Sequence, residues 1–317
     1  MSGGRLRRGK FSRFMENAAP LLCWAAVATL VVVCFFTIGY LLLQGISALN
    51  WGLLTTDPQP ALTESLSGGI RAPMAGTLIL LILGTSLVIL PALGSAIYLA
   101  EYLGEERWLT KAVRFGLEML AGVPSVVFGM WGIAFFAQKE FMFLSGPAAN
   151  TNRAFGRSFL VGAVVLTVHI LPFVIKVMEE AIRGVPRAYR QAAAALGMSK
   201  WATIRKIVLP SAAPGIMTAI ILGMGLIAGD TAIVKLCVGN SMVMTGADQW
   251  WLPWNWGKML IGQGSSLTTF TLYSSPAGDG NSPIKAFGAA FVLIAIVLAL
   301  NLIVEWIMRR NRQPAGD

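Results

Sequence analysis

Six long stretches of the chain contain no Asp, Glu, Lys or Arg, and each is mainly apolar. A membrane-spanning helix needs about 20 such residues, because the hydrocarbon core is about 30 Å thick and a helix rises about 1.5 Å per residue. Strands of a membrane barrel would instead alternate apolar and polar residues, and these stretches do not. The pattern predicts an all-α integral membrane protein with six transmembrane helices. The uncharged stretches are Asn17–Thr56, Ala72–Ala100, Met119–Gln138, Ser158–Ile175, Ile207–Gly229 and Ala286–Val304.

The composition supports this prediction. Of the 317 residues, 56% are hydrophobic and 13% are charged, whereas soluble domains have about 25% charged residues. A soluble enzyme, a disordered chain and a collagen-like fibre are therefore excluded. Three cysteines are too few to form a disulfide scaffold in a chain of this length, and we interpret them as small apolar residues.

The distribution of positive charge predicts the orientation. With six spans, both termini lie on one side, and that side carries most of the 25 Lys and Arg residues. Cytoplasmic loops collect these residues, so both termini are expected in the cytoplasm. Topology and anionic lipid then explain the net charge of +10, and nucleic acid is not expected as a partner.

The first apolar stretch is longer than the core of a signal peptide, so we interpret it as a retained anchor. The predicted organisation is a basic N-terminus, a first helix, an external loop, a domain of five further helices and a basic C-terminus. These parts cover residues 1–19, 20–43, 44–71, 72–305 and 306–317.

A long polar segment, 179–210, interrupts the apolar pattern on the predicted cytoplasmic side. Pro186 stands where a helix can begin, and the residues that follow favour helix. Gly197 can end that helix, and Ser199 can cap the next one. The segment is expected to form two short helices joined by a glycine turn. Its small alanines would let another protein approach closely.

Three features inside or beside the spans carry candidate chemistry. Pro124 and Ser125 interrupt the third apolar stretch, and a proline kink there can either line a path or serve packing. His169, the only histidine, has no partner ligands in the sequence and is expected to bond a neighbouring helix. Four external tryptophans suit an interfacial belt or a docking surface for another protein: Trp250, Trp251, Trp254 and Trp256.

The segment 179–210 resembles the EAA loop of bacterial ABC importer permeases, whose pattern is E-A-A-x3-G-x9-I-x-L-P. The spacing is met throughout, and only the leading glutamate is replaced, by glutamine. The resemblance implies a coupling helix that contacts a separate ATPase subunit through the motif residues Gln191, Ala192, Ala193, Gly197, Ile207, Leu209 and Pro210.

Further segments are similar to the permeases of phosphate (Pst-type) ABC importers, and the external Gly68-Gly69-Ile70 and Ser274-Ser275-Pro276 favour the A-type subunit. The similar segments are 98–102, 114–115, 120–125, 184–187, 229–232 and 273–276. The resemblance implies the type I importer fold and a place in the bacterial inner membrane. It also implies a heterodimer with a C-type permease, two copies of an ATPase subunit and an extracytoplasmic phosphate-binding protein. ATP and Mg²⁺ would bind the ATPase, consistent with the lack of a phosphate-binding G-x-x-x-x-G-K-[ST] motif here, so this chain would need no cofactor and catalyse no reaction.

The family pattern changes around the fifth span. Where these permeases typically have A-R-A-I-G-E-T-A, the arginine is replaced by Leu226 and the glutamate by Asp230. Arginine can pair bidentately with phosphate oxygens. Lys235 stands nine residues after Leu226 and, on one continuous helix, would point to nearly the opposite face. Either the partner permease supplies a cation, or the cargo differs, or the path binds its cargo weakly.

Asp230 is expected to be functional, because a charge at the bilayer centre costs about 2.5–3.5 kcal/mol. The alternative interpretation is that Asp230 lies at a helix end in the membrane interface and has no role in transport. The candidate path residues are Asp230, Thr231, Lys235, Pro124 and Ser125. The leading hypothesis is a phosphate permease that works by alternating access. The alternatives are a permease for another oxyanion and a membrane scaffold or sensor subunit that couples ATPase state to signalling.

Overall fold

The computed structural model describes residues 10–59, 68–103, 107–148, 152–239, 241, 244–245, 252–276, 278, 280 and 282–311. Apart from one isolated bridge between Pro147 and Ala154, the regular structure in these residues is helical. The prediction of an all-α protein is confirmed. Trp250 and Trp251, which were predicted to be external, and most of the basic N-terminus lie outside the described residues.

Within the described part of the chain, five helices are long and apolar enough to cross a membrane. A bent pair of shorter helices passes the same test together and provides a sixth candidate span. The five are α1 (Lys10–Ala48), α3 (Arg71–Ile97) with its π-helical continuation η1 (Tyr98–Tyr102), α7 (Phe159–Arg183), α10 (Leu209–Gly229) and α13 (Pro283–Asn311), and the pair is α4 (Trp108–Ala121) and α5 (Ser125–Phe136).

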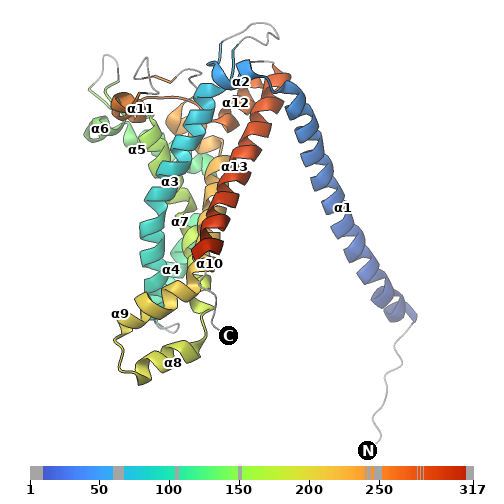
Figure 1. Ribbon diagram of the computed structural model, residues 1–317, viewed down its shortest axis with the longest axis vertical. Coiled ribbons are helices and arrows are strands. Elements are labelled where there is room, and N and C mark those ends of the chain that lie inside the picture. The colour runs from blue at the N-terminus through green and yellow to red at the C-terminus, as the bar shows by residue number, and fades with distance from the viewer. Residues whose placement is uncertain are drawn as a thin grey trace, which may run out of the picture.

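Short elements occupy the two ends of the bundle. At the lower end in Figure 1, α8 (Arg187–Ala195) and α9 (Lys200–Thr203) project beyond the long helices, and η3 (Ile204–Val208) leads from α9 into α10. The opposite end holds α2 (Trp51–Thr55), α6 (Met142–Ser145), α11 (Trp256–Ile261) and α12 (Leu267–Ser274). The remaining elements are η2 (Lys139–Phe141), η4 (Val234–Val238) and η5 (Pro253–Asn255).

Helix α7 lies at the centre of the bundle. It packs most extensively against α3 and α10 and also touches α4, α5 and η4. Small residues allow these close contacts: a Cβ on Gly162 would stand 2.3 Å from Val238, and one on Gly223 would stand 3.0 Å from Val174. The core of the molecule therefore follows α7 along its length.

Helix α1 leaves the bundle. It packs against α13 near its C-terminal end, where Tyr40 meets Phe287 edge-on at 5.7 Å between ring centroids. Its preceding part diverges from the other helices (Figure 1) and exposes large apolar side chains such as Leu22 and Phe35. Helix α1 starts, and α13 ends, toward the end of the molecule where α8 and α9 lie.

The predicted interruption of Met119–Gln138 at Pro124 is confirmed, but it is a break between two helices rather than a kink in one. The helices α4 and α5 meet there at an angle of 95°, so the uncharged stretch begins in the last turn of one helix and ends just beyond the other. Gly122 caps α4, and Pro124 caps α5. Proline has no backbone N–H to continue the first helix, and it disfavours helical backbone in the residue before it.

Candidate functional site

The EAA-like segment forms two short helices joined by a tight turn, as the sequence predicts. Helix α8 ends in hydrogen bonds from Met198 N to the Ala193 carbonyl and from Gly197 N to the Ala194 carbonyl, which is the Schellman arrangement. Gly197 has φ +73°, a conformation that side chains other than glycine strain to adopt. The Ser199 side chain then accepts a hydrogen bond from Ala202 N and caps α9.

This segment presents a surface at the end of the molecule. Gln191, Ala192 and Gly197 are exposed, while Ala193 is buried and anchors α8. Leu196, beside the glycine turn, is 81% exposed. The exposed Leu196, the small residues and the fixed turn together form an apolar surface of the kind found at protein–protein contacts. The other motif residues lie at the entry to α10, where Ile207 and Leu209 are half-buried and Pro210 is exposed in the first helical turn.

A second site lies where α10 ends. Asp230 caps α10 through its backbone, and its side chain accepts a hydrogen bond of 2.7 Å from Ile233 N. The carboxylate thus also starts the short helix that follows. The sequence argument placed Leu226 and Lys235 on one continuous helix. That placement is wrong, because α10 ends at Gly229 and a separate short helix holds Lys235. Asp is among the best N-cap residues, so the signal for this break was present in Asp230-Thr231-Ala232.

Other polar side chains gather around Asp230. Ser125, at the start of α5, and His169 of α7 both lie close enough to the Asp230 carboxylate to influence it electrostatically. The Thr268 hydroxyl donates to the Asp230 carbonyl oxygen at 3.3 Å. We call Ser125, His169, Asp230 and Thr268 the polar cluster. Three separate breaks, before α5, after α10 and before α12, bring it together.

The cluster lies at mid-depth of the bundle. His169 is ten residues from the start of α7, which corresponds to about 15 Å along the helix and half the thickness of the hydrocarbon core. Its Nδ1 is buried and has no hydrogen-bond partner among the described residues. Of the other candidate path residues, Pro124 and Lys235 are exposed and Thr231 is half-buried. Leu226 is 45% exposed, so the position of the family's arginine faces outward from this chain.

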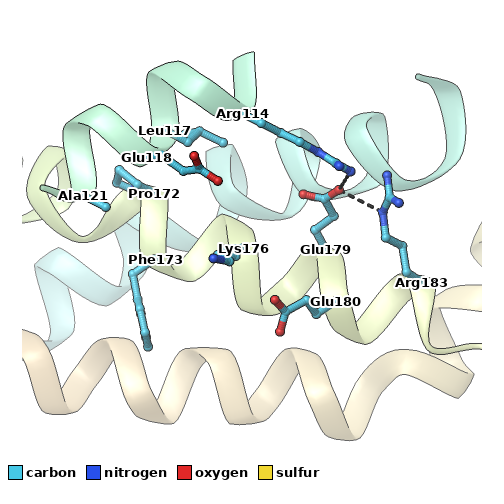
Figure 2. Close-up of a pocket in the computed structure, with 10 residues that line it drawn as sticks. All are labelled: Arg114, Leu117, Glu118, Ala121, Pro172, Phe173, Lys176, Glu179, Glu180 and Arg183. Atoms are coloured by element: carbon cyan, nitrogen blue, oxygen red, sulfur yellow. Dashed lines mark hydrogen bonds and ion pairs between the residues drawn. The ribbon is translucent and has the colours of Figure 1, made fainter. Parts of the chain in front are cut away.

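A cavity of about 430 Å³ lies between α4 and α7. Figure 2 shows Glu179 at its edge between two arginines. The Glu179 carboxylate lies 2.6 Å from Arg114 of α4 and 2.9 Å from Arg183, one turn along α7. The pair of Arg114 with Glu179 was not predicted, because nothing local in a sequence reveals an ion pair 65 residues apart.

A second buried ion pair joins α8 to the bundle. Arg190 donates two hydrogen bonds, of 2.9 and 2.7 Å, to one carboxylate oxygen of Glu101 in η1. The same guanidinium donates to the Val185 and Ile182 carbonyl oxygens at 2.5 and 2.9 Å. The Glu101 side chain is 9% exposed. The polar segment is therefore fixed to the bundle by Arg190.

Comparison with known proteins agrees with this architecture. Residues 92–313 match the family described as "Binding-protein-dependent transport system inner membrane component". Phosphate transport system permease protein PstA 1 of Mycobacterium tuberculosis is 31% identical over 267 residues, which cover 83% of this chain and 78% of that protein. Probable ABC transporter permease protein YqgI of Bacillus subtilis is 28% identical over 90% of this chain and 91% of its own length. PstC 2 of Mycobacterium tuberculosis is 29% identical over 90% of both chains.

Solved structures share the fold. A chain of the inward-facing MetNI methionine ABC transporter aligns with a TM-score of 0.58 at 15% identity, covering 77% of this chain and 96% of its own. A chain of a bacterial alginate ABC transporter, in complex with its pentasaccharide-bound periplasmic protein, aligns with a TM-score of 0.58 at 16% identity, covering 94% and 98%. The chain therefore belongs to the family of binding-protein-dependent transport system inner membrane components, as a multi-pass permease subunit of an importer-type ABC transporter.

Proposed function

We propose that this chain is the A-type permease (PstA) of an ATP-driven importer that moves inorganic phosphate into the cell by alternating access. It pairs with a homologous C-type permease. Two copies of an ATPase subunit bind ATP and Mg²⁺ and hydrolyse the nucleotide, and an extracytoplasmic binding protein delivers the cargo. Both termini and the coupling helix α8 face the cytoplasm, because the Lys and Arg residues are concentrated on that side.

One observation carries the proposal: the exposed surface made by α8, the Gly197 turn and α9. Gln191, Ala192 and Leu196 are exposed there, and the turn that presents them is fixed by two backbone hydrogen bonds. Such a surface is suited to a groove on another protein. Gln191 replaces the motif's glutamate, so its contact with a basic partner residue is a neutral hydrogen bond rather than an ion pair.

The polar cluster supports phosphate as the cargo. Hydrogen phosphate carries a P–OH group, which can donate a hydrogen bond to the Asp230 carboxylate, whereas sulfate at neutral pH has no proton to donate. A site built around such a bond rejects the analogue that lacks it, because the carboxylate is then left facing an anion. Since Leu226 is outward-facing, we assign the compensating cation to the partner permease across the path.

The first test is ATP hydrolysis by the reconstituted complex, with phosphate-loaded and sulfate-loaded binding proteins compared in parallel. Stimulation by the phosphate protein alone supports the proposed cargo and shows that Leu226 is tolerated. Stimulation by the sulfate protein alone contradicts phosphate as the cargo. It favours another oxyanion, the alternative suggested by Leu226 in place of the arginine. If neither protein stimulates an assembled complex, a scaffold or sensor role replaces transport.

The coupling surface predicts a sharp effect of Gly197→Asp. An aspartate at φ +73° strains the turn and adds a charge beside Leu196, so uptake linked to ATP hydrolysis should be abolished while membrane insertion stays intact. Uptake and the amount of membrane-inserted chain are the measurements. Gly257→Asp is the matched control, since that exposed glycine has open space around its Cβ and no positive φ. Normal uptake by Gly197→Asp would show that this surface does not couple.

The polar cluster predicts that Asp230→Asn reduces phosphate uptake without raising basal ATP hydrolysis. Asparagine retains an oxygen that can cap Ile233 N, but its amide replaces the carboxylate that accepts the phosphate proton. We expect a loss of about ten- to hundredfold in uptake, measured with basal hydrolysis in the same proteoliposomes. Glu140→Gln, an exposed carboxylate in η2, should leave uptake unchanged. Uptake by Asp230→Asn at the wild-type level would remove the cluster from the path.

A further inference from the structure

Five ionisable side chains outside the polar cluster are tied into one connected arrangement, which the proposed function leaves without a role. Arg190 of α8 pairs with Glu101 of η1, and Arg114 of α4 pairs with Glu179 of α7. Both carboxylate side chains are 9% exposed, whereas the arginines are 24% and 37% exposed. Removing one partner of such a pair would leave a buried charge without compensation, so the paired segments resist separation.

Arg190 holds three segments at once. Its fork binds Glu101 and also the carbonyl oxygens of Ile182 and Val185, at the end of α7. The guanidinium is planar and its donors are rigidly placed, so it cannot follow one of these segments without pulling the others. Helix α8 is thereby fixed to the last turn of α7 and to η1.

Arg183 and Glu179 continue the connection. Arg183 donates to the Leu99 carbonyl oxygen of η1 at 3.2 Å and lies 2.9 Å from the Glu179 carboxylate. The same carboxylate oxygen accepts from Arg114 of α4 at 2.6 Å. Figure 2 shows Glu179 between the two arginines that it joins. The contacts therefore run without interruption from α8 through η1 and α7 to α4.

The connection ends near the break between α4 and α5. Arg114 lies in the middle of α4, whose last residue is Ala121, and α5 begins with Ser125. Ser125 lies beside the Asp230 carboxylate. A displacement of α8 that is transmitted to α4 would therefore reach the sharp bend between α4 and α5, next to Ser125 of the polar cluster.

We infer that Glu101 and Glu179 are positioning residues for coupling: they fasten α8 to η1, α7 and α4, so that movement of α8 turns α4 about its break with α5. The inference rests on the proposed role of α8 as the surface that the ATPase moves. It assigns a mechanical function to two carboxylates that lie outside both the docking surface and the polar cluster. Neither carboxylate contacts the cargo.

The test uses the complete complex, with partner permease and ATPase, reconstituted in proteoliposomes. The variants are Glu101→Gln, Glu179→Gln, Arg190→Gln and the Glu101→Gln/Arg190→Gln double variant. Glu180→Gln is the matched control, because Glu180 adjoins Glu179 but its side chain is exposed. The two readouts are phosphate imported per ATP hydrolysed and the nucleotide-dependent labelling of a reporter cysteine in α5.

The reporter is Val126→Cys in a background where the exposed Cys23 and Cys34 are replaced by serine; Val126 follows Ser125 and is 49% exposed. Its thiol is labelled with and without a non-hydrolysable ATP analogue. The parent without Val126→Cys measures labelling of the buried Cys237. Labelling needs no cargo, so it tests the inference even if the phosphate proposal fails. Failure of the phosphate proposal is recognised separately, as a wild-type complex that hydrolyses ATP without importing phosphate.

We expect Glu101→Gln and Glu179→Gln to lower the import per ATP by about tenfold, within the range of typical coupling between sites, and to abolish the nucleotide-dependent change in labelling. Hydrolysis should persist. The double variant should be no worse than Arg190→Gln alone, since that variant already removes the contact with Glu101 along with the two carbonyl contacts. Glu101→Asp, which keeps the charge, should restore part of the coupling. If a glutamine variant fails to assemble, Arg190→Lys provides the test, because it keeps the charge but loses the fork.

Two results would overturn the inference. One is an unchanged import per ATP and unchanged labelling in Glu101→Gln and Glu179→Gln. The other is a parallel fall of import and hydrolysis in proportion to the amount of assembled complex, which would make the ion pairs anchors of the fold alone.

Discussion

Helices α1 and α7 are almost equally apolar but have opposite environments. Within the most apolar 18-residue window of each, half of the α7 residues are buried and none of the α1 residues are. Both sequences satisfy the requirement for a membrane span. Hydropathy therefore identifies a helix that can enter the membrane, but it does not say which helices form the core of the protein.

The difference lies in how closely neighbours can approach. Lipid tails are as apolar as leucine, so helices in a membrane associate through van der Waals packing at small residues rather than through hydrophobic burial. Gly162 of α7 lies in contact with Val238, and Thr167 of α7 reaches Gly84 of α3. Gly39 of α1 has nothing within 4 Å of the position of a Cβ.

The largest expected effect is the difference in assembly between substitutions at Gly162 of α7 and Gly39 of α1. Gly162→Leu should greatly reduce the amount of folded, assembled chain, because a Cβ at this position would stand 2.3 Å from Val238 and the closely packed core cannot move away at low cost. Gly39→Leu should leave assembly unchanged, since the same side chain points into open space. The measurement is the yield of monodisperse protein after detergent extraction, together with its thermal midpoint.

Equal losses in the two glycine variants would contradict the division between a packed α7 and an unpacked α1. A loss in Gly39→Leu that occurs only when the partner permease is co-expressed would show that α1 is covered in the complex. That result would sharpen the comparison by assigning α1 to an intersubunit contact.

A second, smaller effect is the difference in stability between substitutions at Phe159 of α7 and Phe35 of α1. Phe159 of α7 is fully buried, and its ring lies 3.2 Å from where a Cβ on Gly76 would stand and 2.6 Å from where one on Gly264 would stand. Phe35 of α1 is 75% exposed. Phe159→Ala should destabilise the protein by about 3–5 kcal/mol, the usual cost of removing a buried aromatic side chain. Phe35→Ala should change stability by less than about 0.5 kcal/mol. Unfolding in mixed micelles of increasing denaturing detergent measures both, and a similar cost for the two would refute the burial difference.

The local structure of the segment 179–210 was largely predictable from the sequence. Pro186 begins α8, Gly197 adopts the left-handed turn, and Ser199 caps α9. Each of these features is decided by residues within a few positions of one another, through capping and backbone preference. The fold class was also predictable, because the uncharged stretches leave helices as the only suitable element.

The polar cluster was predicted only in pieces. Asp230 and Ser125 were singled out separately, but their contact depends on a 95° break between α4 and α5, and the angle of such a break is set by packing rather than by proline alone. His169 was expected to bond a neighbouring helix, and its proximity to Asp230 was missed. The pair Glu101–Arg190, which is 89 residues apart in the chain, has no local signal at all.

The smallest predicted effect concerns two threonines with the same local bond. Thr167 of α7 and Thr29 of α1 each donate at 2.8 Å to the carbonyl oxygen four residues earlier, but the Thr167 hydroxyl also lies 3.4 Å from the Gly84 carbonyl oxygen of α3. Thr167→Val keeps the shape and removes this contact between helices, which should cost about 0.6 kcal/mol. Thr29→Val removes only the bond within its own helix and should be neutral. The same micelle unfolding measures both variants. Neutrality of Thr167→Val would mean that shape alone, without the hydroxyl, holds α7 against α3.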